Sequence, residues 1–122
     1  LFKNRLGRTG GGVALYISDK LSFSQRKDLT FSSDSCTDSL FIDISGPHLS
    51  KITVGVIYRP PNSNTKTFLD EFQSITKTLG HKHNESVLAG DFNLNLLNHN
   101  VHNETGKFLN NVLSASFVPL IT

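Results

Sequence analysis

The 122-residue chain contains no methionine and no tryptophan, and it has a single cysteine. Because even an initiator methionine is missing, we expect the chain to be a fragment of a longer protein. The lone Cys36 excludes an internal disulfide, which is typical of an intracellular, reducing compartment. Its acidic neighbours Asp34 and Asp38 disfavour a thiolate, so Cys36 is not expected to be a nucleophile.

Long apolar runs and concentrated charge are missing as well. No run approaches the roughly 20 residues that cross a bilayer, and nothing resembles a signal peptide, so no membrane partner is expected. The 12 Lys and Arg residues are scattered and outnumber 10 Asp and Glu only slightly, without the basic stripe of a dedicated nucleic-acid binder. With 37% hydrophobic residues, the composition excludes a disordered tail and indicates one domain with a real core.

Several apolar runs have the length and composition of strands. Residues 13–17 follow a glycine run and are predicted to form a buried strand, and Leu29 and Phe31 could form a short one. The runs 40–44 and 51–58, joined by a Gly-Pro turn, predict a hairpin. One face of its second strand carries Ile52, Val54, Val56 and Tyr58.

Two helices are predicted, with a short buried strand over 86–93 between them. The first covers about 66–79, with Thr65 or Thr67 as N-cap and Gly80 as its stop. The second covers about 104–115. The apolar stripes comprise Phe68, Leu69, Phe72, Ile75 and Leu79 in the first helix and Phe108, Leu109, Val112 and Leu113 in the second. Hairpin and crossover connections together predict an α/β fold with a mixed sheet.

The most informative stretch for chemistry is Gly-Asp-Phe-Asn at 90–93. On an extended segment Asp91 and Asn93 point the same way and Phe92 points into the layer behind, while Gly90 leaves room for a substrate. A carboxylate can orient or deprotonate water, and an amide can hydrogen-bond a phosphate oxygen without adding negative charge. This pair suits phosphodiester chemistry at the carboxyl end of a strand. The alternative is a strand that simply ends in an Asx turn.

Tyr58-Arg59-Pro60-Pro61 is the second candidate. The Tyr58 ring can pack on the core while its hydroxyl reaches the rim and donates to a phosphate oxygen. Arg59 could add a charge-assisted contact and so bind substrate. The alternative for Tyr58 is an ordinary tyrosine at the edge of the core.

Together, Gly-Val-Ile-Tyr-Arg-Pro-Pro-Asn at 55–62 and Leu-Ala-Gly-Asp-Phe-Asn at 88–93 resemble the endonuclease/exonuclease/phosphatase superfamily. The stretches 10–17 and 103–121 fit this resemblance, in particular to the apurinic-like endonuclease domain of non-LTR retrotransposon polyproteins of the jockey type (LINE elements). The resemblance implies a DNase I-like layered β-sandwich flanked by helices. Residues 1–122 would be one partial domain, an interior fragment truncated at both ends.

The resemblance also implies residue roles. Asp91 would position or activate the attacking water, Asn93 would contact the scissile phosphate, and Tyr58 would hydrogen-bond it. The family's metal-binding Glu would lie before residue 1 and its catalytic His after residue 122. The chain alone is therefore expected to bind Mg²⁺ (or Mn²⁺) weakly, if at all, and to be inactive.

The activity implied by the resemblance is Mg²⁺-dependent nicking of target DNA, with contacts to the phosphate backbone. Its partner would be the reverse-transcriptase region of the same polyprotein, and its location would be the nucleus when it acts on target DNA. Two alternatives are a phosphatase of the same superfamily and a non-catalytic remnant of an inserted retroelement.

Overall fold

The computed structural model describes residues 2–3, 11–80, 84–95, 97 and 103–120. Gly10 and Ile121, at the ends of the stretches 10–17 and 103–121, lie outside these residues. The strands are β1 (Phe2–Lys3), β2 (Val13–Ala14), β3 (Ser22–Gln25), β4 (Asp38–Gly46), β5 (Leu49–Tyr58) and β6 (Glu85–Asp91). The helices are a 3₁₀ turn (Ser33–Ser35), α1 (Thr65–Gly80) and α2 (Asn103–Ser114). No helix in the described ranges is long and apolar enough to cross a membrane.

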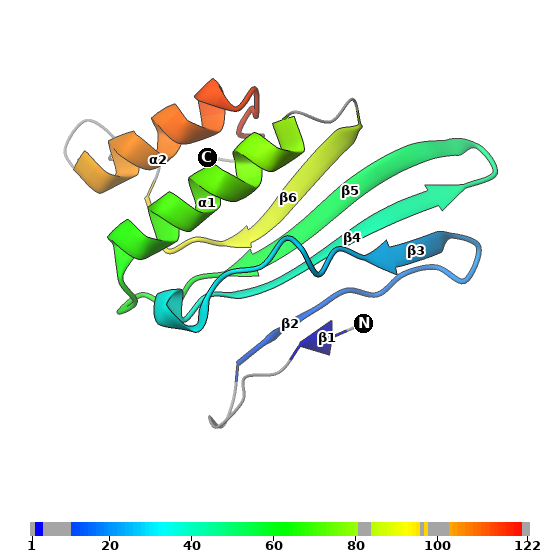
Figure 1. The fold of residues 1–122 in the computed structure, drawn as a ribbon, viewed down its shortest axis with the longest axis horizontal. Coiled ribbons are helices and arrows are strands. Elements are labelled where there is room, and N and C mark those ends of the chain that lie inside the picture. Colours follow the sequence, from blue (N-terminus) through cyan, green and yellow to red (C-terminus); the bar gives the residue numbers. More distant parts are fainter. Residues whose placement is uncertain (1, 4–10, 81–83, 96, 98–102, 121–122) are drawn as a thin grey trace.

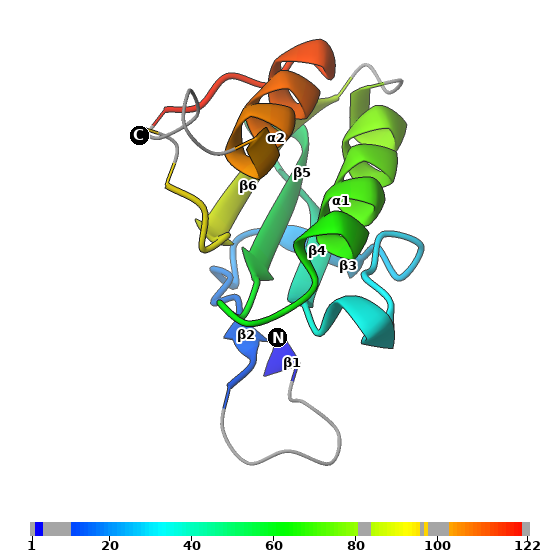
Figure 2. The same cartoon turned by 90° about the vertical axis from the view of Figure 1, so that its left-hand side faces the viewer.

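The main sheet has four strands in the order β3-β4-β5-β6 (Figure 1). β3, β4 and β5 pair antiparallel, and β6 adds parallel to β5 after the α1 crossover. The predicted hairpin and mixed α/β sheet are therefore confirmed. Both helices cover one face of this sheet, and the small β1-β2 sheet lies against the other face, in contact with β4 and β5 (Figure 2).

An aromatic core lies between the helices and the sheet. The buried members are Leu29, Phe31, Phe41, Ile57, Phe68, Leu69, Phe72, Ile75, Leu79, Phe108 and Val112. The whole predicted stripe of α1 is buried, as expected. In α2 only part of the stripe is buried, because Phe108 and Val112, one turn apart, face the sheet while Leu113 stays 53% exposed. The rings of Phe72 and Phe108 join the two helices at a centroid distance of 5.0 Å.

The helices pack on the face of β5 that carries Thr53, Gly55 and Ile57, all buried. The face with Ile52, Val54, Val56 and Tyr58 is only half-buried. Gly55 leaves room on the first face for the core residue Phe41, because a Cβ at position 55 would lie 2.5 Å from the Phe41 ring. Both faces of β5 are apolar enough to be buried, so the period of two could not say which one meets the helices.

Other segments differ from the sequence prediction because tertiary contacts override local pattern. The stretch 13–17 is not a buried strand: β2 covers two residues, and Tyr16 is 99% exposed. β6 is largely exposed, because it is the edge strand among the described residues. Leu29 and Phe31 are buried core residues but form no strand.

Two local features depend on the structure and not on the sequence pattern. The residues of β3, Ser-Phe-Ser-Gln, are all exposed and mostly polar, as an edge strand tolerates, so they carry no strand pattern of their own. The N-terminal cap of α1 is Asn64 rather than Thr65 or Thr67, since its side-chain oxygen accepts the N–H of Thr67 at 3.1 Å. α1 thereby begins directly after the Pro60-Pro61 turn at the end of β5, which leads the chain back over the sheet.

Candidate active site

Tyr58 and Asp91 lie side by side at the carboxyl ends of two parallel strands. They are register partners of β5 and β6, so their side chains project from the same face of the sheet. Tyr58 is half-buried and Asp91 is exposed. A phenol and a carboxylate at the open end of parallel strands form the kind of site that α/β folds place there.

Asp38 completes a row with these two residues. It pairs with Tyr58 from the other side, at the start of β4, and is only 7% exposed. The local sequence pattern marks Asp38 only as an acidic neighbour of Cys36. The signal that could have found it was the hairpin, because its register brings Asp38, two residues before the apolar run 40–44, opposite Tyr58.

The chain turns sharply after Asp91. Asn93 has a left-handed φ of 50°, and its N–H donates to the Asp91 carboxylate oxygen Oδ1 at 2.9 Å. The expectation of an extended segment, with both side chains pointing the same way, is therefore wrong. The Asx turn considered as the alternative is present. It also fixes the orientation of the carboxylate, so the turn and a chemical role are compatible.

Phe92 anchors this turn in the core, as predicted. Its ring lies 5.7 Å from that of Phe72 and 5.3 Å from that of Phe108, measured between centroids. Gly90 precedes Asp91, and the backbone geometry at this position requires glycine. Its φ is +151°, and a Cβ there would lie 1.8 Å from the carbonyl oxygen of Ile57. The close approach of β5 and β6 requires glycine, whatever room it leaves for a substrate.

Arg59 points into the protein rather than toward the open end of the strands. Arg59 is 2% exposed, and its Nε and Nη2 donate to the carbonyl oxygens of Phe92 and Asn93 at 2.7 and 2.9 Å. Burial lowers its pKa, and the charges of Glu104 and Asp91 oppose that shift. The phosphate contact predicted for Arg59 therefore has no exposed donor in this structure.

The described residues do not form a metal site by themselves. Within them, no three His, Cys, Asp or Glu side chains come together as a cation would require. Asp91 and Asp38 are two strands apart, with Tyr58 between them. Mg²⁺ usually takes one or two carboxylates with water and substrate phosphates, so a site here needs a further ligand.

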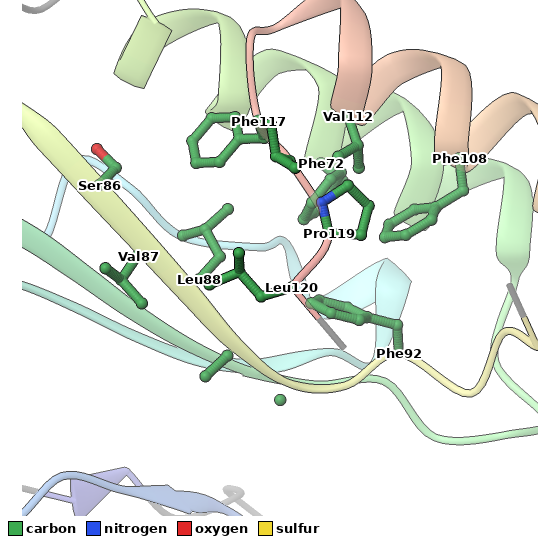
Figure 3. Close-up of a pocket in the computed structure, with 13 residues that line it drawn as sticks. Phe72, Ser86, Val87, Leu88, Phe92, Phe108, Val112, Phe117, Pro119 and Leu120 are labelled. Atoms are coloured by element: carbon green, nitrogen blue, oxygen red, sulfur yellow. The ribbon is translucent and has the colours of Figure 1, made fainter. Parts of the chain in front are cut away.

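A cavity of about 390 Å³ lies at the free edge of β6, away from the polar residues. Figure 3 shows it lined by Leu88, Phe92, Phe108, Phe117 and Leu120, from β6, the turn that follows it, α2 and the C-terminal segment. Tyr58, Asp91 and Asn93 do not line it. This hollow is apolar and offers no group for acid–base chemistry, so the candidate site is the polar end of the sheet.

The four-stranded mixed sheet with two helices on one face matches the fold of a solved endonuclease domain, as the sequence resemblance implied. Among solved structures the chain is similar to one described as "Endonuclease domain of TRAS1, a telomere-specific non-LTR retrotransposon". The TM-score is 0.62 at 15% identity, and the match covers 80% of this chain and 42% of the other. At this identity the likeness establishes the fold. No protein-family model and no curated protein sequence matches the chain.

Proposed function

We propose that this chain carries the central part of an endonuclease site that hydrolyses DNA phosphodiester bonds. The observation that carries the proposal is the pairing of Tyr58 and Asp91 at the carboxyl ends of β5 and β6. The fold supports it, because the similar solved structure is a retrotransposon endonuclease domain. The chain spans less than half of that domain, so the activity belongs to a larger unit.

Each residue has a distinct part in this proposal. The exposed Asp91 carboxylate, held by the N–H of Asn93, orients a water and takes its proton as the water attacks phosphorus. The Tyr58 hydroxyl donates to a phosphate oxygen as negative charge grows there. One N–H of the Asn93 amide bonds the carbonyl of Arg59, and its second N–H is the donor proposed for the phosphate. The P–O3′ bond breaks as the new P–O bond to water forms, and the leaving O3′ takes a proton from solvent water, so that the nick carries a 3′-hydroxyl and a 5′-phosphate.

Mg²⁺, with Mn²⁺ as a substitute, is proposed as the cofactor of the larger unit. When bound, a divalent cation neutralises charge on the phosphate in the transition state. The described residues supply too few ligands for it. The resemblance matches no residue of this chain to the family's metal-binding Glu, so no step is assigned to the metal here.

The proposed substrate is the phosphate backbone of target DNA, and the proposed partner is a reverse-transcriptase region of the same polyprotein. Nuclear action follows from that substrate. A 3′-hydroxyl left by the nick is the end that a reverse transcriptase extends. The weak net charge of +2 gives little nonspecific attraction to DNA, so the site rather than bulk charge has to position the strand.

A nicking assay separates this proposal from its alternatives. The protein, expressed from the longest open reading frame that encodes the chain, is incubated with supercoiled plasmid in Mg²⁺ or in chelator. We expect Mg²⁺-dependent nicks with extendable 3′-hydroxyl ends. Release of phosphate from inositol phosphates without nicking would indicate the phosphatase, and neither activity would indicate a non-catalytic remnant.

A further inference from the structure

We propose that Arg59 is a positioning residue that locks the Asp91–Asn93 turn to the end of β5 and the start of α1. This inference rests on the proposed function, because the turn it holds carries the proposed water-orienting carboxylate. It assigns Arg59 a part that differs from a phosphate contact. The two motifs of the sequence, Tyr-Arg-Pro-Pro and Gly-Asp-Phe-Asn, would then form one physical unit.

Hydrogen bonds run in both directions between Arg59 and the turn. The Arg59 backbone N–H donates to the carbonyl oxygen of Asp91 at 2.9 Å. Its Nε and Nη2 donate to the next two carbonyls, those of Phe92 and Asn93. In return, Nδ2 of Asn93 donates to the Arg59 carbonyl. Every residue of the turn is thus bonded to one arginine.

The remaining nitrogen of the Arg59 guanidinium, Nη1, reaches the start of α1. Nη1 of Arg59 lies 3.2 Å from the hydroxyl oxygen of Ser63 and 3.4 Å from that of Thr65. The guanidinium also lies over the Phe68 ring, 5.6 Å from its centroid. One buried cation therefore fixes three segments relative to one another: the end of β5, the turn after β6 and the first residues of α1.

Only arginine can make this set of contacts. Its planar guanidinium has five N–H donors in a fixed fork, whereas the lysine ammonium is a compact point charge. The acceptors of the Arg59 guanidinium are carbonyl and hydroxyl oxygens, so the geometry, more than an ion pair, specifies the residue. At 2% exposure the fork is not available to a DNA phosphate without opening the turn.

Arg59→Lys and Arg59→Gln test the inference in the protein from the longest reading frame. A displaced carboxylate lowers turnover without changing how DNA is bound, and a misplacement of about 1 Å can lower the rate about 10²-fold. We expect kcat for nicking to fall about 10-fold or more in both variants. KM and the salt dependence of DNA binding should change less than about twofold. Arg26→Gln, which removes another largely buried arginine, beside Asp28 and Asp43, is the matched control and should keep wild-type kcat.

A phosphate contact predicts a different pattern. If Arg59→Gln raises KM and lowers the salt slope of binding by about one, while Arg59→Lys retains kcat, the positioning role is wrong. Should both variants fail to fold, Ser63→Ala removes one half-buried acceptor of the fork and should lower kcat alone, by a few-fold. An unchanged kcat in Ser63→Ala would then contradict the proposal.

Hydrogen exchange separates this inference from the proposed activity, because it needs no turnover. In Arg59→Lys, amides of residues 91–95 should exchange at least about 10-fold faster, while those of β4 keep their wild-type rates. Equal protection of 91–95 in both proteins would overturn the lock even if the protein nicks DNA. Faster exchange in a protein that does not nick would keep the lock and reject the proposed function.

Discussion

The Asp91 carboxylate can both form a turn with Asn93 and remain available for acid–base chemistry. The bond from the Asn93 N–H to the Asp91 carboxylate satisfies a backbone donor at the end of a strand. It also holds the carboxylate in one orientation, which an acid–base group requires. From the local sequence, an Asx turn and a chemical role for Asp91 are alternatives. The structure shows that the Asx turn is formed and leaves Asp91 exposed, so the two are compatible.

Tyr58→Phe is the most conservative change in the row. It removes the hydroxyl proposed to donate to the phosphate and keeps the ring, which is half-buried between Asp38 and Asp91. We expect kcat for nicking to fall about tenfold or more, as for loss of a preorganised donor. The free energy of unfolding should drop by no more than about 1.5 kcal/mol. Steady-state nicking and urea denaturation measure the two effects, and an unchanged kcat would remove Tyr58 from the site.

At the scale of elements, the regular parts of the fold could be predicted and the site geometry only partly. The stripe of α1 and the 40–44 and 51–58 hairpin follow from period and turn chemistry, which are local properties. The buried face of β5 could not be predicted, since it depends on helices that pack there later in the chain. The inward path of Arg59 depends on carbonyls 33 and 34 residues away. Local pattern contains no trace of such contacts.

The β5-β6 pair depends on Gly90. Alanine at this position would place Cβ 1.8 Å from the Ile57 carbonyl oxygen and would require a φ of +151° that side chains disfavour. Gly90→Ala should therefore lower the free energy of unfolding by about 3 kcal/mol or more and displace Asp91. Gly80→Ala, at the open end of α1, is the matched control, since its Cβ would meet only the Ala115 carbonyl oxygen, at 3.4 Å. Equal denaturation midpoints for the two variants would contradict this account.

On the scale of the whole molecule, a charge cluster around the buried Asp43 ties the sheet together at a distance from the site. Asp43, 7% exposed, accepts a hydrogen bond from the Thr53 hydroxyl at 2.7 Å and pairs with Lys51 and Arg26. Burial raises its pKa, but the bonds from Thr53 and Lys51 and the charge of Arg26 outweigh that effect and lower the pKa below the ordinary 3.8.

This lowered pKa predicts a pH dependence of stability. A carboxyl group with a folded pKa below its unfolded value stabilises the fold above the unfolded pKa. That contribution is lost as the pH falls through the folded value. We expect the free energy of unfolding to decrease below about pH 4, and Asp43→Asn to have a shallower decrease. Urea denaturation between pH 7 and pH 2.5 measures both, and parallel curves for the two proteins would show that Asp43 is not responsible.

The exposed apolar side chains also belong to the molecular scale. Val87 is 51% exposed on β6, and Val118 and Leu120 are 71% and 91% exposed beside the cavity at its free edge. Exposed apolar side chains of this kind mark surfaces that other protein segments can cover, and the chain spans 42% of the similar endonuclease domain. Activity is therefore best measured on the protein from the longest reading frame that encodes the chain.

The central claim is that Asp91 orients or activates the water that cleaves DNA. The most direct test is the turnover rate of plasmid nicking in Mg²⁺ for Asp91→Ala, compared with Asp70→Ala, an exposed acid on α1. The claim predicts that Asp91→Ala lowers kcat about 10²-fold or more, about 3 kcal/mol in the barrier, and that Asp70→Ala leaves kcat unchanged. Full nicking by a folded Asp91→Ala protein would contradict the site assignment and, with it, the proposed function.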